Sequence, residues 1–161
     1  TEIKNAGEGK EAWVKIKINH ITDTDMVTKL YQASKAGVKI DIVIRGNCSL
    51  VPGIKGLSEN IRCVGIIDRY LEHSRILIFA NGGKPRYFLG SADWMPRNLL
   101  NRIEVLTPVY DEELQADLMR TISYGMRDTT NGRIVDGKGT NNFVEGEPFR
   151  SQQELYKEYK K

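Results

Sequence analysis

The pattern of residue types between residues 12 and 44 constrains the fold of this chain most. Residues 12–18 alternate apolar and basic side chains, which is typical of a strand with one covered face. Apolar residues at helical spacing then run from Met26 to Ala33, Gly37 provides a stop, and residues 38–44 are a second apolar run. A strand, a helix and a strand in this order predict a right-handed βαβ unit with parallel strands.

Further segments extend this unit into a larger sheet. A turn-rich stretch at 81–85 separates two short apolar runs, which predicts an antiparallel hairpin. The strands expected after the βαβ unit are 61–67, 76–79, 87–90 and 102–109. Because parallel and antiparallel pairs occur together, we predict an α/β fold with a mixed β-sheet flanked by helices.

The helices are predicted from apolar periodicity and capping residues. Thr22 or Thr24 is expected to cap the first helix, and Ser151 a last short helix that ends at Tyr159. Between them, residues 111–127 form an amphipathic pattern. The side chains of this pattern that are expected to face inward are Leu114, Leu118, Met119 and Ile122.

The two ends of the chain give weaker signals. Residues 1–10 are polar and contain glycine, so we expect a frayed lead-in. Residues 128–148 are rich in glycine and asparagine, with weak strand patterns at 133–135 and 142–144. We therefore divide the chain into a domain at 1–127 and a C-terminal extension at 128–161.

Composition limits the possible partners. The 161 residues, 40% hydrophobic and 28% charged, suffice for one domain with a core. A net charge of +3 permits an anionic ligand, but no Lys/Arg-rich run of the nucleic-acid type occurs, so we expect no nucleic-acid partner. Cys48 and Cys63 lack metal-ligand spacing, and no metal site is predicted. No apolar run approaches the roughly 20 residues of a membrane span.

Polar residues stand where strands are expected to begin or end. Asn19 and Arg45 follow the two parallel strands, and ligands of open α/β sheets gather at such ends. His73 and Arg75 stand at the start of the run 76–79, and side chains two residues apart in a strand point the same way. Histidine can carry a proton or a phosphoryl group, and arginine matches phosphate oxygens. We predict a phosphate-handling site at His73.

A second polar stretch, residues 90–102, is expected at the same end of the sheet. Arg97 and Arg102 would add cations for a polyanionic ligand. Ser91, Asp93 and Asn98 either support the site or only shape a turn. Glu72 and Asp93 are the candidates for a carboxylate that fixes the tautomer of His73.

Two of these motifs resemble a known signature. His73-x-Arg75 followed by Gly90-Ser91-x-Asp93 is similar to the His-x-Lys and Gly-Ser-x-Asn signature of the phospholipase D superfamily. Arginine replaces lysine here, the usual downstream aspartate is missing, and Asp93 stands where asparagine is common. The resemblance implies a phospholipase-D-like α/β domain.

Longer motifs resemble the carboxy-terminal region of the polyphosphate kinase family, a divergent relative of that superfamily. They run in order from about residue 12 to about residue 110, and after residue 128 the resemblance is weak. Among them are Ile44-Arg45-Gly46-x-Cys48-Ser49-Leu50, Arg69-Tyr70-Leu71-Glu72-His73-Ser74-Arg75 and Ser91-Ala92-Asp93-Trp94-Met95-x-Arg97-Asn98.

This second resemblance implies a reaction and a role for each matching residue. Polyphosphate kinases reversibly move the terminal phosphate of ATP onto inorganic polyphosphate, with Mg²⁺ and through a phosphohistidine. Two phospholipase-D-like domains each supply one active-site histidine, and this chain resembles the second. His73 then supports acid–base chemistry or phosphate binding, while the phosphorylated histidine belongs to the first domain. Arg45 matches a contact to nucleotide phosphates, and Arg97 and Arg102 match basic positions near the phosphate path.

The same resemblance implies partners and a location. The expected ligands are ATP or ADP and inorganic polyphosphate, and the expected protein partners are the other domains of a full-length chain. We expect that full-length chain to be a cytoplasmic homo-oligomer, with membrane association left open. The isolated domain is expected to bind phosphates weakly and not to turn over.

Two other functions stay open from the sequence. One is a phospholipase-D-type phosphodiesterase or nuclease half-site, against which Arg75 argues because it replaces the usual lysine. The other is a non-catalytic phosphate-binding or assembly module. His20 is interpreted as a solvent-facing loop histidine, and the tyrosines and lysines from Tyr156 onward as a solvated helix end.

Overall fold

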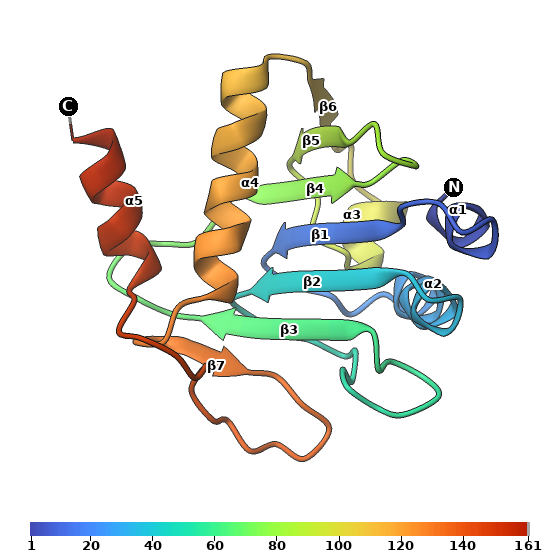
Figure 1. The fold of residues 1–161 in the computed structure, drawn as a ribbon, viewed down its shortest axis with the longest axis horizontal. Helices are drawn as coiled ribbons and strands as arrows, with labels where there is room; N and C mark the ends of the chain where they lie inside the picture. The colour runs from blue at the N-terminus through green and yellow to red at the C-terminus, as the bar shows by residue number, and fades with distance from the viewer. Residues whose placement is uncertain (161) are drawn as a thin grey trace.

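The computed structural model describes residues 1–160, in which seven strands form one mixed sheet (Figure 1). The strand order is β6-β5-β4-β1-β2-β3-β7, and the three strands β1, β2 and β3 are parallel. Every other neighbouring pair is antiparallel. The strands are β1 Trp13–Ile18, β2 Lys39–Ile44, β3 Ile61–Ile66, β4 Arg75–Phe79, β5 Arg86–Gly90, β6 Leu106–Val109 and β7 Gly132–Ile134. The predicted mixed α/β sheet is confirmed.

Helices cover the sheet, and strand alternation divides the core between its two faces. Ile42 and Val43 are consecutive in β2, and each is buried in a different apolar cluster. The Ile42 cluster includes α2 residues such as Leu30, and the Val43 cluster includes α4 residues such as Ile122. The helices are α1 Glu2–Gly7, α2 Thr24–Lys35, α3 Pro96–Leu100, α4 Glu112–Met126 and α5 Ser151–Tyr159.

The βαβ unit is present as predicted, with one change at its cap. The register of β1 on β2 runs from Trp13 opposite Lys39 to Ile18 opposite Ile44. The residue that caps α2 is Asp23, whose carboxylate accepts the Met26 backbone N–H at 3.0 Å. The expected threonine cap is therefore wrong, and the reason is position: Asp23 directly precedes the first helical turn.

Residues near the N-terminus differ from the expected frayed lead-in. Residues 2–7 form α1, in which Glu2 and Asn5 are buried. The Glu2 carboxylate accepts the Asn81 backbone N–H at 3.0 Å, so a contact distant in sequence orders this segment. A short polar helix held by such a contact has no apolar periodicity to reveal it.

Three finer expectations are also corrected. Only residues 106–109 of the expected strand 102–109 pair with β5. Leu114 is 56% exposed, because it lies in the first turn of α4, beyond the sheet that buries Ile122. Ser151 is the first helical residue of α5 rather than its cap, and its hydroxyl donates to the Asp128 carboxylate at 2.6 Å.

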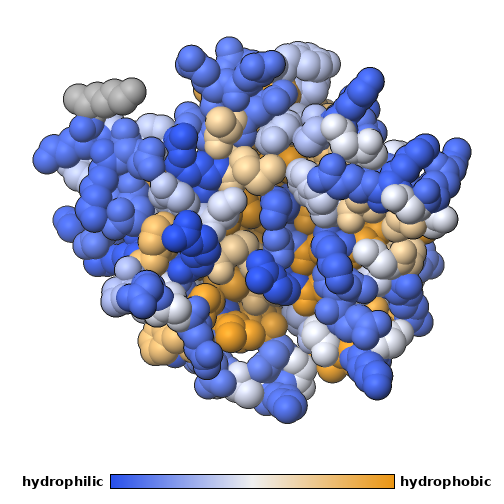
Figure 2. Space-filling model, viewed as in Figure 1, coloured by the Kyte–Doolittle hydropathy of each residue, from blue (hydrophilic) through white to orange (hydrophobic). Residues whose placement is uncertain are grey.

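The C-terminal segment packs against the rest of the chain. β7 extends the sheet beside β3, and Arg133 bridges to Phe143. α5 lies beside α4, where the Tyr124 hydroxyl donates to Glu158 at 2.6 Å. Figure 2 shows that hydrophilic residues cover the α5 side of this view. The division at residue 128 stays a prediction, and residue 161 of the proposed extension lies outside the described residues. No helix within residues 1–160 is long and apolar enough to cross a bilayer.

Candidate active site

The side chain of His73 lies where β1 and β2 end and β4 begins. β4 runs antiparallel to β1, so its first residues meet the carboxyl ends of the parallel strands (Figure 1). Arg45 follows β2, and its Nε donates to Asn19 Oδ1 at 2.7 Å. The Nη2 of Arg45 lies 3.1 Å from Nδ1 of His73. The predicted meeting of these three residues at one edge of the sheet is confirmed.

The Asp93 carboxylate connects Asn19, His20 and Arg75 through hydrogen bonds. Its Oδ1 accepts the backbone N–H groups of Asn19 and His20 at 3.0 and 3.2 Å. Its Oδ2 accepts Nη2 of Arg75 at 3.2 Å, and Nη1 of Arg75 donates to the His73 carbonyl oxygen at 2.9 Å. His73 is therefore held through its ring by Arg45 and through its backbone by Arg75.

The carboxyl group of Asp93 is held in its charged form. Burial acts to raise the pKa of this carboxyl, but the hydrogen bond from Arg75 and the two backbone N–H groups outweigh it, so the pKa lies below its usual range. The Arg75–Asp93 pair is largely buried, with 15% and 8% of the two side chains exposed. This ion pair, together with the backbone hydrogen bonds of Asp93, fixes the start of β4 against the end of β1.

Neither carboxylate that we considered for fixing the His73 tautomer contacts the ring. Asp93 is bound to Arg75 and to backbone, as described above. Glu72 pairs with Lys17 at 2.8 Å, and both side chains are largely buried. Lys17 was not predicted for the site, because a lysine in an alternating strand suggests the exposed face. The only sequence feature that pointed to the Lys17–Glu72 pair was the position of Glu72 directly before His73.

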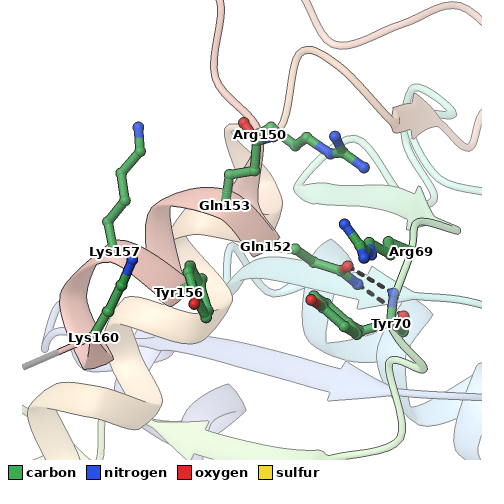
Figure 3. Close-up of a pocket in the computed structure, with 8 residues that line it drawn as sticks. All are labelled: Arg69, Tyr70, Arg150, Gln152, Gln153, Tyr156, Lys157 and Lys160. Atoms are coloured by element: carbon green, nitrogen blue, oxygen red, sulfur yellow. Dashed lines mark hydrogen bonds between the residues drawn. The ribbon is translucent and has the colours of Figure 1, made fainter.

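A residue from α5 also supports this segment. Gln152 accepts the Tyr70 backbone N–H at 2.9 Å and donates to the Tyr70 carbonyl oxygen at 2.8 Å, as drawn in Figure 3. Its amide also donates to Glu72 at 2.6 Å. Arg150 adds two hydrogen bonds to Asp68, at 2.9 and 2.5 Å. The start of α5 therefore clamps the segment that leads to His73.

Ser91 and Asn98 organise a neighbouring loop rather than the His73 ring. Both donate hydrogen bonds to Glu104, which the sequence did not single out, and the Asn98 bond is 2.7 Å long. The backbone N–H of Val105 donates to the Ser91 hydroxyl at 3.0 Å. Hydrogen bonds from Ser91 and Asn98 hold the pKa of the Glu104 carboxyl below its usual range, and the charges of Arg102 and Arg75 add to this.

The two remaining predicted cations, Arg97 and Arg102, lie at the exposed rim of the candidate site. Arg97 in α3 and Arg102 in the following loop are both exposed. Within residues 1–160, no hydrogen bond or ion pair connects either side chain to Arg45 or His73. Their guanidinium groups are therefore available to a ligand, and their predicted phosphate contacts stay predictions.

His20 belongs to the site's surroundings, contrary to the expected solvent-facing loop position. The ring is half-buried, and its Nδ1 accepts the Asn47 backbone N–H at 3.0 Å. A Cβ atom at Gly46 would lie 2.4 Å from the His20 ring and 2.9 Å from the Asn19 carbonyl oxygen. Gly46 is thus required for the close packing that sets the position of Arg45.

The fold is that of a phospholipase-D-like domain. Nuc from Salmonella typhimurium, a phospholipase D family member, matches with a TM-score of 0.59 over 84% of this chain and 89% of its own, at 14% identity, which is a likeness of fold. The family of the chain follows from sequence: the family model described as polyphosphate kinase C-terminal domain 2 matches residues 1–154. The chain belongs to this family.

Similar proteins agree with that assignment. A polyphosphate kinase of Vibrio vulnificus is 48% identical over 158 residues, and that of Escherichia coli K12 is 43% identical over 143 residues. The crystal structure of polyphosphate kinase from Porphyromonas gingivalis matches 99% of this chain with a TM-score of 0.94 and 41% identity. This chain spans only 23%, 21% and 25% of the three proteins, respectively.

Proposed function

We propose that this chain supplies one half of a polyphosphate kinase active site. The reaction is the reversible transfer of the terminal phosphate of ATP onto inorganic polyphosphate, through a phosphohistidine on another domain. The observation that carries this proposal is the 3.1 Å contact between Arg45 Nη2 and His73 Nδ1, at a sheet edge where ligands of α/β folds bind. Family membership supports the choice of reaction.

The contact with Arg45 favours a donor role for His73. A guanidinium group has only donors, so Nδ1 of His73 accepts from Arg45 Nη2. The proton of the neutral ring then lies on Nε2, which has no hydrogen-bond partner within residues 1–160. An N–H group donates to a phosphate oxygen and cannot attack phosphorus. This supports a binding or acid–base role for His73 and a nucleophile elsewhere.

The arginines divide into two roles in this proposal. Arg45 is half-buried beside the exposed His73, and we propose that it contacts nucleotide phosphates, with Arg97 and Arg102 binding phosphates at the rim. Arg75 stays in the predicted phosphate-binding set. However, its three nitrogens contact Asp93 and the His73 carbonyl oxygen, which favours a positioning role.

The family resemblance implies Mg²⁺, but the carboxylates beside His73 do not fit the ion's ligand set. Glu72 is bound by Lys17 and Gln152, and Asp93 by Arg75 and backbone N–H groups. Within residues 1–160, no group of three or more His, Cys, Asp or Glu side chains could hold a metal ion. We therefore assign no residue of this chain to the ion.

The remaining partners belong to the same proposal. ATP or ADP and inorganic polyphosphate are the ligands, and the rest of a longer, homo-oligomeric cytoplasmic chain completes the site. Exposed apolar side chains support a contact with another domain: Leu100 is 77% exposed, Ile103 101% and Tyr110 80%. Without the histidine of the first domain, the isolated domain should not turn over.

The test is polyphosphate synthesis from ATP by a full-length polyphosphate kinase that carries this domain. His73→Ala should reduce synthesis by about 10²- to 10⁴-fold, the range of a lost general acid or base. Ser74→Ala is the matched control, because Ser74 is exposed and its side chain makes no hydrogen bond within the described residues. Equal synthesis by both variants, with equal melting temperatures, would contradict the proposal and favour an assembly module.

A further inference from the structure

A basic cleft lies between α5 and the segment that leads to His73, and Figure 3 shows the residues that line it. Its volume is about 590 Å³. Two glutamine amides line it, and none of its described lining residues is acidic. Its cationic side chains are Arg69, Arg150, Lys157 and Lys160, and its aromatic side chains are Tyr70 and Tyr156.

Half of the positive charge in this cleft is not neutralised by the protein. Arg150 pairs with Asp68 at 2.5 Å and Lys157 with Glu154 at 2.7 Å. Within residues 1–160, neither of the other two cations has a carboxylate within ion-pair distance. Each lies over a tyrosine ring instead, Arg69 at 5.6 Å and Lys160 at 5.8 Å. The cleft therefore presents net positive charge to solvent.

The cations come from more than one wall of the cleft. Gln153, Tyr156, Lys157 and Lys160 follow the spacing of one helix face over roughly 10 Å, and two of these four, Lys157 in α5 and Lys160 directly after it, are cations. Arg69 faces these residues from the opposite wall (Figure 3). A single phosphate group can contact only some of these cations. A linear ligand that repeats a negative charge along its length can contact all of them.

The cleft also adjoins the candidate active site. Tyr70 in its wall is bound through its backbone to Gln152, and Gln152 in turn binds Glu72. Glu72 directly precedes His73, so the wall of the cleft and the active-site segment are one continuous stretch of chain. The cleft is therefore linked to His73 through the chain, three residues beyond Tyr70.

We propose that this cleft binds the chain of inorganic polyphosphate outside the reacting end. This inference rests on the proposed function, because that function identifies the polyanion as polyphosphate. The positive charge of the cleft, spread over two walls, matches a chain of several phosphates, and Arg69 and Lys160 supply the contacts not already used in ion pairs within the protein. A nucleotide stacked on a tyrosine and a single-stranded nucleic acid are the competing occupants.

The test measures binding to this chain by titration calorimetry at one low ionic strength. The test variant combines Arg69→Gln and Lys160→Gln, a pair that breaks no ion pair of the fold. The matched control combines Lys84→Gln and Arg86→Gln, which removes the same charge from exposed residues in the turn between β4 and β5 and at the start of β5. The probes are long-chain polyphosphate, tripolyphosphate, ATP and polyuridylate.

The cleft variant should lose roughly tenfold in affinity for long-chain polyphosphate, about 1.4 kcal/mol, and the control less than about twofold. Tripolyphosphate and ATP should respond less than the long chain, because they are too short to contact all the cations of the cleft. Equal losses in both variants, or no binding of polyphosphate by the unmodified chain, would overturn the proposal. So would a larger loss for ATP or polyuridylate. The His73→Ala synthesis assay judges the proposed function separately.

Discussion

Asn19 connects the two supports of His73. Its side-chain oxygen accepts from Arg45, and its backbone N–H donates to Asp93, which pairs with Arg75. Its Nδ2 is buried without a hydrogen-bond partner in the described chain. A buried donor without a partner costs free energy, and an oxygen atom of the proposed phosphate ligand beside Arg45 would accept from it.

At the residue scale, the Asp93 charge should make stability depend on pH. The pKa of its carboxyl is lower in the folded chain than in the unfolded one. Its stabilisation is therefore fully present above an unfolded pKa of about 4, and it is lost as pH falls through the lower folded pKa. Asp93→Asn removes the charge and should destabilise the chain by about 1–3 kcal/mol near pH 7.

Thermal melts of both proteins from pH 7 to pH 3 provide the measurement. The difference in melting temperature should be largest near neutral pH and should shrink in acid, because the Asp93 carboxyl takes up a proton as the pH falls and loses the charge that the Asp93→Asn variant lacks at every pH. A difference that stays constant over this range would show that the Asp93 charge does not stabilise the fold.

At the element scale, α5 supports the segment between β3 and β4. Gln152 and Tyr70 are far apart in sequence, yet three hydrogen bonds join Gln152 to residues 70–72. Arg150 and Asp68 make a second link, and this ion pair holds the pKa of the Asp68 carboxyl below its usual range. The C-terminal helix therefore contributes to the site without contacting His73.

This support predicts a local effect for Gln152→Ala. The variant removes the partners of the Tyr70 backbone and of Glu72, so we expect a loss of about 1–3 kcal/mol in the free energy of unfolding. Hydrogen exchange of the Tyr70 amide should accelerate at the same time. Gln153→Ala is the control, because Gln153 is exposed and its side chain makes no hydrogen bond within residues 1–160. Equal hydrogen-exchange rates of the Tyr70 amide in both variants would contradict the inference that Gln152 supports residues 70–72.

At the scale of the whole molecule, local patterns and distant contacts explain what the sequence could predict. The βαβ unit and the hairpin were predictable, because alternation and turn residues are local signals. The same reasoning located Asn19, Arg45 and His73 at one edge. It missed α1, the Lys17–Glu72 pair and the role of Gln152, because each depends on residues that only the folded chain brings together.

The division of labour between two histidines is the central claim, and labelling tests it most directly. A full-length polyphosphate kinase that carries this domain is incubated with ATP labelled at its terminal phosphate, and the acid-labile phosphohistidine is located by peptide mapping. Because a guanidinium donor at Nδ1 of His73 favours the tautomer with its proton on Nε2, we predict label on a histidine outside this domain and none on His73. Label on His73 would contradict the account and make this histidine the nucleophile.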